Sequence, residues 1–127
     1  MSESVQFKNL APNLVVPDVV KTAEYYRDVL GFEILGYFLD PPVFSMVRRG
    51  RVELHFGKSD GENILRNEMV RRGLGTDVYI FVEGIEALHS ELKQTGANIL
   101  TDLTKRPYGC VEFEMLDCDG HKIVFGE

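Results

Sequence analysis

Polar residues alternate with apolar ones along residues 51–56, which is the pattern of a β-strand with one buried face. Arg51, Glu53 and His55 share the polar face. A carboxylate that faces a concave site needs a partner, so Glu53 is a candidate ligand contact or metal ligand, or else the salt-bridge partner of Arg51 or another neighbour. His55 is a candidate hydrogen-bond donor or general base, or else an ordinary histidine at the rim of the sheet.

A second group of candidates lies in the C-terminal half. Glu112 and Glu114 alternate with apolar residues, so they either add negative charge to a site or line a solvated sheet face. Tyr108, in the loop before that strand, could stack on a flat or cationic ligand, or be an ordinary turn residue. Asp77 and Tyr79 share one face of another predicted strand, and the tyrosine belongs either to the wall of a site or to the core.

The bulk composition limits the classes of protein to consider. The 127 residues carry a net charge of −6 and are 44% hydrophobic and 27% charged, which is typical of one soluble globular domain. An acidic balance argues against nucleic acid as a partner and favours a cationic ligand. No apolar run approaches the roughly 20 residues that span a bilayer, and the N-terminus lacks the pattern of a secretory signal, so we expect no membrane partner.

The cysteines and the remaining histidines offer little chemistry. Cys110 and Cys118 flank a predicted strand that would hold them about 26 Å apart, so we expect free thiols and a cytoplasmic protein. Their spacing suits neither a structural zinc site nor a nucleophile with a neighbouring base. His89 lies beside the apolar stripe of a predicted helix and should pack there, whereas His121 follows a tight turn and is expected to be exposed.

The elements that would position these candidates occur twice in the same order. Residues 13–57 predict a strand, a helix and three strands, and residues 76–126 predict the same series. Asp18 is a good N-cap for the first helix. Apolar positions recur every three or four residues along both helices, at Val19, Ala23, Tyr26 and Leu30 and at Ile85, Leu88 and Leu92.

We therefore expect a single α+β domain over residues 1–127, made of two βαβββ modules. The modules lie at about 8–57 and 76–127, and the linker at 58–75 is predicted to hold one short helix at about 63–71.

Each helix can cover only one face of its sheet. Burial of one apolar side chain against the helix stabilises the fold by about 1.5–3 kcal/mol, and the residues expected there are Val52, Leu54, Phe56, Ile123 and Phe125. The other face is too mixed for a core and too apolar in places for a plain surface. Two curved sheets side by side would enclose a trough lined by that face, and ligand sites favour such concave, partly apolar places.

Three stretches resemble the vicinal oxygen chelate superfamily, at residues 13–18 (NLVVPD), 23–32 (AEYYRDVLGF) and 117–125 (DCDGHKIVF). That superfamily includes glyoxalase I, extradiol dioxygenases, fosfomycin-resistance transferases and bleomycin-resistance proteins. The resemblance covers nearly the whole chain and implies a cupped mixed sheet of eight strands with the helices outside. Residues 44–56 (FSMVRRGRVELHF) are most similar to the bleomycin-resistance branch.

The resemblance also implies where a metal would lie. Enzymes of the superfamily hold a divalent ion with side chains from the first and last strands of each module, and the ion polarises a carbonyl or activates oxygen. The matching positions here are Ala11, Glu53, Asp77 and Val124. Alanine and valine cannot bind a metal, and two carboxylates are fewer than the three or more protein ligands of a tightly held catalytic ion. We therefore expect no cofactor.

Three hypotheses follow. The first is a metal-independent, antibiotic-resistance-like protein that sequesters a cationic or aromatic small molecule as a homodimer, because the bleomycin-resistance branch binds a cationic glycopeptide in an acidic groove between two subunits. The alternative is a metal-dependent isomerase, lyase or dioxygenase with an altered ligand set. A third option is a trough filled by its own side chains. The ligand contacts expected under the first hypothesis are Arg51, Glu53, His55, Asp77, Tyr79, Tyr108, Glu112 and Glu114.

Overall fold

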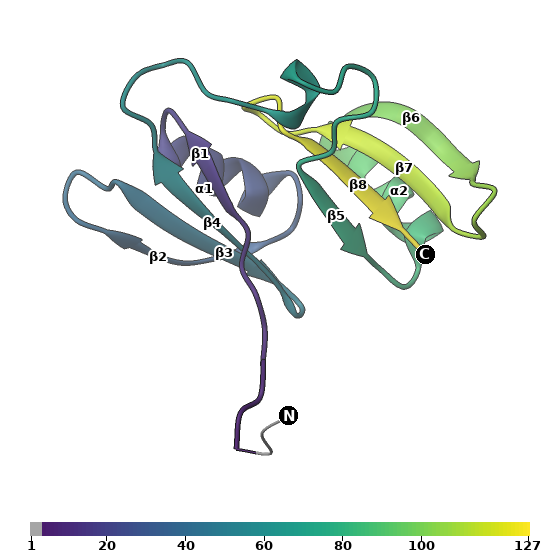
Figure 1. Cartoon of the computed structure of the whole chain (residues 1–127), viewed down its shortest axis with the longest axis horizontal. Helices are drawn as coiled ribbons and strands as arrows, with labels where there is room; N and C mark the ends of the chain where they lie inside the picture. Colours follow the sequence, from purple (N-terminus) through teal and green to yellow (C-terminus); the bar gives the residue numbers. More distant parts are fainter. Residues whose placement is uncertain (1–3) are drawn as a thin grey trace.

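The computed structural model describes residues 4–127 and contains two βαβββ modules in succession (Figure 1). The first consists of β1 (Asn13–Val16), α1 (Val19–Asp28), β2 (Glu33–Phe38), β3 (Phe44–Arg49) and β4 (Val52–Lys58). The second consists of β5 (Val78–Phe81), α2 (Ile85–Thr95), β6 (Asn98–Lys105), β7 (Val111–Leu116) and β8 (Lys122–Gly126). The α+β class and the repeated order of elements are confirmed.

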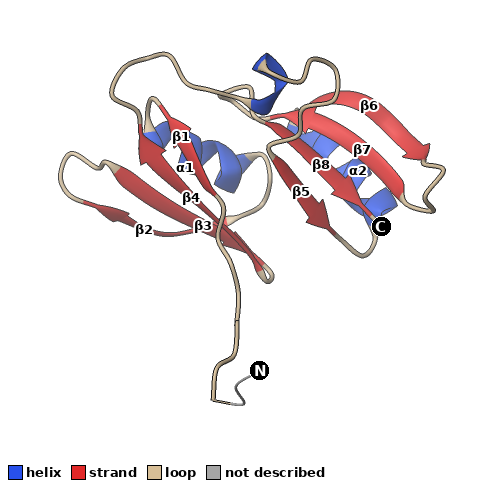
Figure 2. Ribbon diagram, viewed as in Figure 1, coloured by secondary structure: helices blue, strands red, loops and turns tan. Residues whose placement is uncertain are grey.

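Each module forms its own four-stranded mixed sheet, in the orders β1-β4-β3-β2 and β5-β8-β7-β6. The first and last strands of each module pair in parallel, and the other neighbours are antiparallel. Asn13 thereby lies opposite His55 in one sheet, and Tyr79 lies opposite Val124 in the other. Figure 2 shows both helices on the same side of the two sheets, which leaves the other faces without a helix.

We call these two uncovered sheet faces, taken together, the open face. Leu54 and Phe56 of β4 are fully buried in the core on the helix side, so the alternating Glu53 and His55 belong to the open face. In β7 the buried Phe113 packs against α2, and Glu112 and Glu114 lie on the open face by the same alternation.

The first module follows its sequence signals closely. The carboxylate of Asp18 accepts hydrogen bonds from the backbone amides of Val20 and Lys21, both at 3.1 Å, and this caps the start of α1. The predicted stripe of α1 is buried, and the ring of Tyr26 packs 4.9 Å from that of Phe56, centroid to centroid. The helix therefore buries the face that its periodicity predicts.

The second module is packed in the same way around Phe113. The ring of Phe113 lies 5.0 Å from the imidazole of His89 in α2 and 5.1 Å from the ring of Phe125. His89 is buried, which confirms its expected packing role. The two helices span 10 and 11 residues, and no helix within residues 4–127 is long and apolar enough to cross a membrane.

The linker differs from its prediction. The helix expected at 63–71 is shortened to one 3₁₀ turn, η1 (Asn67–Met69). Longer-range bonds hold this segment, since Asn67 donates through its backbone amide to Asp77 and through its side-chain amide to the carbonyl of Thr76, at 2.9 and 2.7 Å. Gly75 closes the loop where a Cβ atom would lie only 2.5 Å from the backbone of Asn67, so no larger residue fits.

Candidate functional site

A pocket of about 240 Å³ opens between β4 and β5 on the open face. It brings together three of the predicted site residues, Arg51, Glu53 and Tyr79. The segment before β1 forms one wall, and Phe81, which is 77% exposed, forms part of another. The pocket therefore combines one basic and one acidic side chain with aromatic surface.

Glu53 and His55 form a pair on the first sheet. The Oε2 atom of Glu53 lies 2.5 Å from the Nε2 atom of His55, and both side chains are mostly buried. The ring of Phe44 in β3 meets the imidazole edge to face, 5.3 Å away. Glu53 is thus partnered by His55 rather than by Arg51, whose guanidinium makes no ion pair within residues 4–127. That guanidinium remains available to a ligand.

Glu112 is the centre of a hydrogen-bonded cluster on the second sheet. Glu112 is only 4% exposed, and its carboxylate accepts bonds from the hydroxyls of Tyr79 (2.6 Å) and Tyr108 (2.8 Å) and from Nε of Arg106 (3.2 Å). Burial raises the pKa of Glu112, but the three donors outweigh it and leave this pKa below its ordinary value. Burial, and then the bond to Glu112, raises the pKa of Tyr79. The group is therefore a carboxylate with neutral tyrosines around it.

Basic side chains compensate part of the negative charge on this sheet. Glu114 lies 3.4 Å from Nη2 of Arg106 and 3.9 Å from Nζ of Lys122, and Lys122 also reaches Glu68 of the linker at 2.9 Å. Sequence reasoning missed both cations. Lys122 could have been found from the sequence, because side chains along a strand point alternately to its two faces. Lys122 therefore shares the face of Val124, which was one of the positions considered for a ligand.

A sequence profile described as the Glyoxalase/Bleomycin resistance protein/Dioxygenase superfamily matches residues 8–125, which is more than nine-tenths of the chain. The chain belongs to this superfamily. No curated protein sequence matches the chain significantly.

Solved structures of the superfamily fold are similar over almost the whole chain. The bleomycin-binding protein from bleomycin-producing Streptomyces verticillus, crystallised with copper(II)-bleomycin, has 25% identity and a TM-score of 0.72, and the match covers 95% of this chain and 96% of that one. A glyoxalase-related enzyme from Clostridium phytofermentans has 21% identity, a TM-score of 0.76 and coverage of 99% and 98%. TioX from Micromonospora sp. ML1 has 16% identity, a TM-score of 0.75 and coverage of 95% and 98%.

Glu53 and Asp77, the two carboxylates at the metal-ligand positions that the resemblance implies, lie in different pockets. Glu53 lines the pocket between β4 and β5, whereas Asp77 lines another, of about 380 Å³, beside the linker. The carboxylate of Asp77 accepts the backbone amides of Asn67 and Lys122, both at 2.9 Å. It serves to fix the linker to β8, and the structure does not bring it together with Glu53.

The expectation that His121 is exposed was wrong. His121 is only 2% exposed, whereas its position after a tight turn predicts exposure. Its ring shares the linker-side pocket with Asn13 of β1, so distant parts of the chain close around it. In contrast, Cys110 and Cys118 are free thiols, as expected.

A larger pocket, of about 540 Å³, lies where the two modules meet. Its lining is largely apolar and includes Leu30 and Phe125, with the ion pair of Arg49 and Glu91 at the rim. Of the eight predicted site residues it contains only Arg51. The predicted chemistry is therefore concentrated on the open face and not at this joint.

Proposed function

We propose that this chain is a metal-independent small-molecule-binding protein of its superfamily, which sequesters a cationic or aromatic compound on the open face. The observation that carries the proposal is the pocket lined by Arg51, Glu53 and Tyr79, which adjoins the Glu112 cluster through Tyr79. Concave sites with a few fixed polar groups and aromatic walls are the usual form of small-molecule sites.

The aromatic side chains favour a flat or cationic compound. Tyr108 is 68% exposed and Phe81 77% exposed, although large aromatic side chains are normally covered in a folded domain. Tyr79 packs against Phe81 with their ring centroids 4.8 Å apart, so the wall is held in place before a ligand arrives. A cation over such rings gains about 0.5–2 kcal/mol.

The relative from Streptomyces verticillus, crystallised with copper(II)-bleomycin, supports small-molecule binding by this fold. It does not name the compound for this chain, whose identity to it is 25%. Bleomycin is therefore the first probe and not the proposed ligand.

The alternative function, a metal-dependent isomerase, lyase or dioxygenase, has less support on the open face. It would need an ion held by Glu53 together with another ligand, but Glu53 is paired with His55 and Asp77 is bound to two backbone amides. The residues at the two other expected positions, Ala11 and Val124, have no donor atoms in their side chains.

The direct test is ligand-dependent stability. Metal-free bleomycin, copper(II)-bleomycin and the cationic dye acridine orange are titrated into the purified chain, and the melting temperature and the heat of binding are measured. A compound at about 100 times its dissociation constant adds roughly 2.7 kcal/mol to the free energy of unfolding. Tyr108→Ala should weaken binding about tenfold because it removes the exposed ring that shares Glu112 with Tyr79, next to the pocket.

The matched control is Tyr37→Ala, which removes a half-exposed tyrosine on β2 that lies near Glu24 and Arg27 of α1. It should leave binding unchanged. Equal losses in both variants, or no binding of any of the three probes at millimolar concentration, would contradict the proposed site.

We also propose that the protein is a homodimer and that it works in the cytoplasm. The segment before β1 exposes Val5, Phe7 and Leu10, and Phe7 is 99% exposed, which favours burial against a second copy. The free thiols Cys110 and Cys118 are typical of a reducing compartment.

A further inference from the structure

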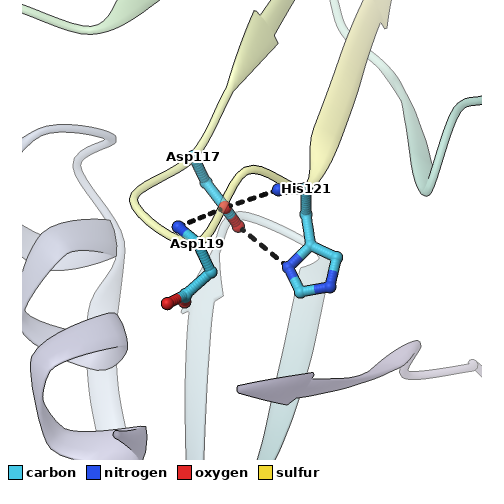
Figure 3. A group of neighbouring side chains, drawn as sticks. All are labelled: Asp117, Asp119 and His121. Carbon is cyan, nitrogen blue, oxygen red and sulfur yellow. Dashed lines mark hydrogen bonds and ion pairs between the residues drawn. The ribbon is translucent and has the colours of Figure 1, made fainter. Parts of the chain in front are cut away.

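The turn that joins β7 to β8 carries two aspartates and a histidine close to one another, outside the open face. One ligand atom from each of Asp117, Asp119 and His121 lies within 4.8 Å of the others. Figure 3 shows the carboxylate of Asp117 between the other two residues, with the imidazole of His121 directed at it. Neighbouring acidic residues alone do not indicate a metal site. The hydrogen bonding of the His121 imidazole is therefore the observation that matters.

The Nδ1 atom of His121 is fully buried and has no hydrogen-bond partner. Within residues 4–127 it is the only side-chain nitrogen or oxygen in that condition. Leaving such a group unsatisfied destabilises a folded protein, so a buried imidazole nitrogen without a hydrogen-bond partner indicates a further component at this position.

The distance from the imidazole of His121 to the carboxylate of Asp117 is close to the distance between two ligands of one metal ion. Nδ1 of His121 lies 3.7 Å from Oδ2 of Asp117, which exceeds the ordinary range of a hydrogen bond. Two ligands at about 2.1 Å from a tetrahedral ion are roughly 3.4 Å apart. A small closure of the side chains would therefore place an ion between them.

The turn holds Asp117 in a fixed position. Its Oδ1 atom accepts the backbone amides of Asp119 and His121, both at 2.9 Å, and Gly120 takes a positive φ of 81° that completes the turn. The Oδ2 atom is then left for the hydroxyl of Tyr26, at 2.7 Å, and for the side facing His121.

Hydroxyl groups of α1 orient both carboxylates from the other module. Tyr26 donates to Asp117, and Thr22 donates to Oδ2 of Asp119 at 2.5 Å. Ligating carboxylates in metal sites are commonly held by such outer hydrogen bonds. An ion at this turn would therefore fasten the second module to the first helix.

The surrounding charge also suits a cation. Arg66, the neighbouring cation, donates at 2.9 Å to the backbone carbonyl of Asp119 and leaves both carboxylates uncompensated by arginine. The linker-side pocket that His121 lines also contains Asp60 and Asp77, and neither lysine nor arginine lines it. It therefore places further negative charge on the linker side of the imidazole.

We propose that Asp117, Asp119 and His121 bind a divalent transition-metal ion, which stabilises the joint between the modules and takes no part in the open-face site. Imidazole nitrogen with carboxylate oxygen selects ions such as Zn²⁺ over Ca²⁺ and Mg²⁺, which prefer oxygen ligands alone.

The experiment uses the full chain freed of metal by a chelator and dialysed against Zn²⁺. Zinc per chain is measured by mass spectrometry, and the melting temperature is measured with and without zinc. We expect one zinc per chain and a rise in melting temperature that a chelator reverses. Asp119→Asn should lower the zinc affinity by about 100-fold, and Thr22→Val, which removes an orienting hydroxyl, by about tenfold.

His121→Gln should abolish zinc binding, but His121 is so buried that this substitution can also disturb folding. Asp119 is only half-buried, so Asp119→Asn is the decisive variant. The matched control is His55→Gln, which removes the histidine of the open face. The proposal fails if the wild-type chain binds less than one equivalent under tenfold excess, or if zinc is lost from His55→Gln and retained by Asp119→Asn. Binding of the open-face probes to the chelated chain is measured separately, so either proposal can fail alone.

Discussion

At the scale of single residues, Glu112 is the most strongly partnered group on the open face. Its carboxylate accepts three hydrogen bonds, from Tyr79, Tyr108 and Arg106, and it is nearly inaccessible to solvent. A buried carboxylate in this state orders the tyrosines that would contact a ligand. Its ionisation should therefore affect both stability and the shape of the pocket wall.

Glu112→Gln should lower the free energy of unfolding at pH 7 by about 1–3 kcal/mol, because a neutral amide replaces the buried acceptor of three bonds. Since the pKa of Glu112 is lowered in the folded state, its contribution is complete above the unfolded value near 4.3 and is lost as the pH falls through the folded pKa. Urea titrations of both chains from pH 7 to 3.5 should show the difference shrinking at the acid end.

Glu114→Gln is the matched control, because the contacts of Glu114 to Arg106 and Lys122 are longer, at 3.4 and 3.9 Å. It should cost less at every pH. A difference between Glu112→Gln and the wild type that stays constant from pH 7 to 3.5 would show that the charge of Glu112 does not contribute.

At the scale of elements, side-chain contacts join the two modules. Arg49, at the end of β3, makes a two-pronged ion pair with Glu91 of α2, at 2.6 and 2.9 Å, and also donates to the carbonyl of Leu30. Thr95 of α2 donates to the carbonyl of Val29 at 2.8 Å. These contacts tie the ends of α1 and β3 to the second helix.

Glu91→Gln should destabilise the chain by about 0.5–1 kcal/mol, a small value because both side chains are about 40% exposed and solvent screens the pair. The bond to Arg49 lowers the pKa of Glu91, so this stability is present above the unfolded pKa and lost as the pH falls through the folded one. The difference should also vanish in 1 M salt.

Chemical unfolding in low and high salt measures this effect. Glu33→Gln provides the comparison, since its ion pair with Arg48 joins neighbouring strands of one sheet and both partners are more exposed. An equal or larger loss in Glu33→Gln would show that the joint between modules gains nothing from Arg49.

The elements themselves could be predicted where local signals decide them. The stripe of Val19, Ala23 and Tyr26 and the N-cap at Asp18 depend only on spacing along the chain, and both are observed. The helix predicted at 63–71 was wrong in extent, because bonds from Asn67 to residues of the second module hold that segment in another conformation. Long-range contacts override weak propensity there.

At the scale of the whole molecule, the limits of sequence reasoning concern which distant residues meet. Alternation places Glu53 and His55 on one face, and they form a pair. The bond between Tyr79 and Glu112 requires that β8 lie between β5 and β7, which no local pattern specifies. The burial of His121 likewise depends on how the linker and β1 close around it.

The proposed homodimer concerns the whole molecule, because residues 5–12 form no helix or strand and the chain before β1 runs away from the two sheets toward its N-terminus (Figure 1). Phe7, at 99% exposed, would bury its ring only against a second copy. Transfer of one such side chain from water stabilises association by about 1.5–3 kcal/mol. The dimer should therefore depend on Phe7 much more than the fold of each chain does.

Phe7→Ser should weaken the dimer by roughly ten- to a hundredfold, as measured by sedimentation equilibrium across a concentration series. The unfolding free energy of the separated chains should stay unchanged, since Phe7 contacts little of its own chain. Leu65→Ser, at an exposed apolar position in the linker, is the matched control and should leave the dimer intact. A wild-type chain that sediments as a monomer at high micromolar concentration would contradict the homodimer. Equal effects of the two substitutions would place the contact surface elsewhere, because Phe7 would then contribute no more to the dimer than Leu65 does.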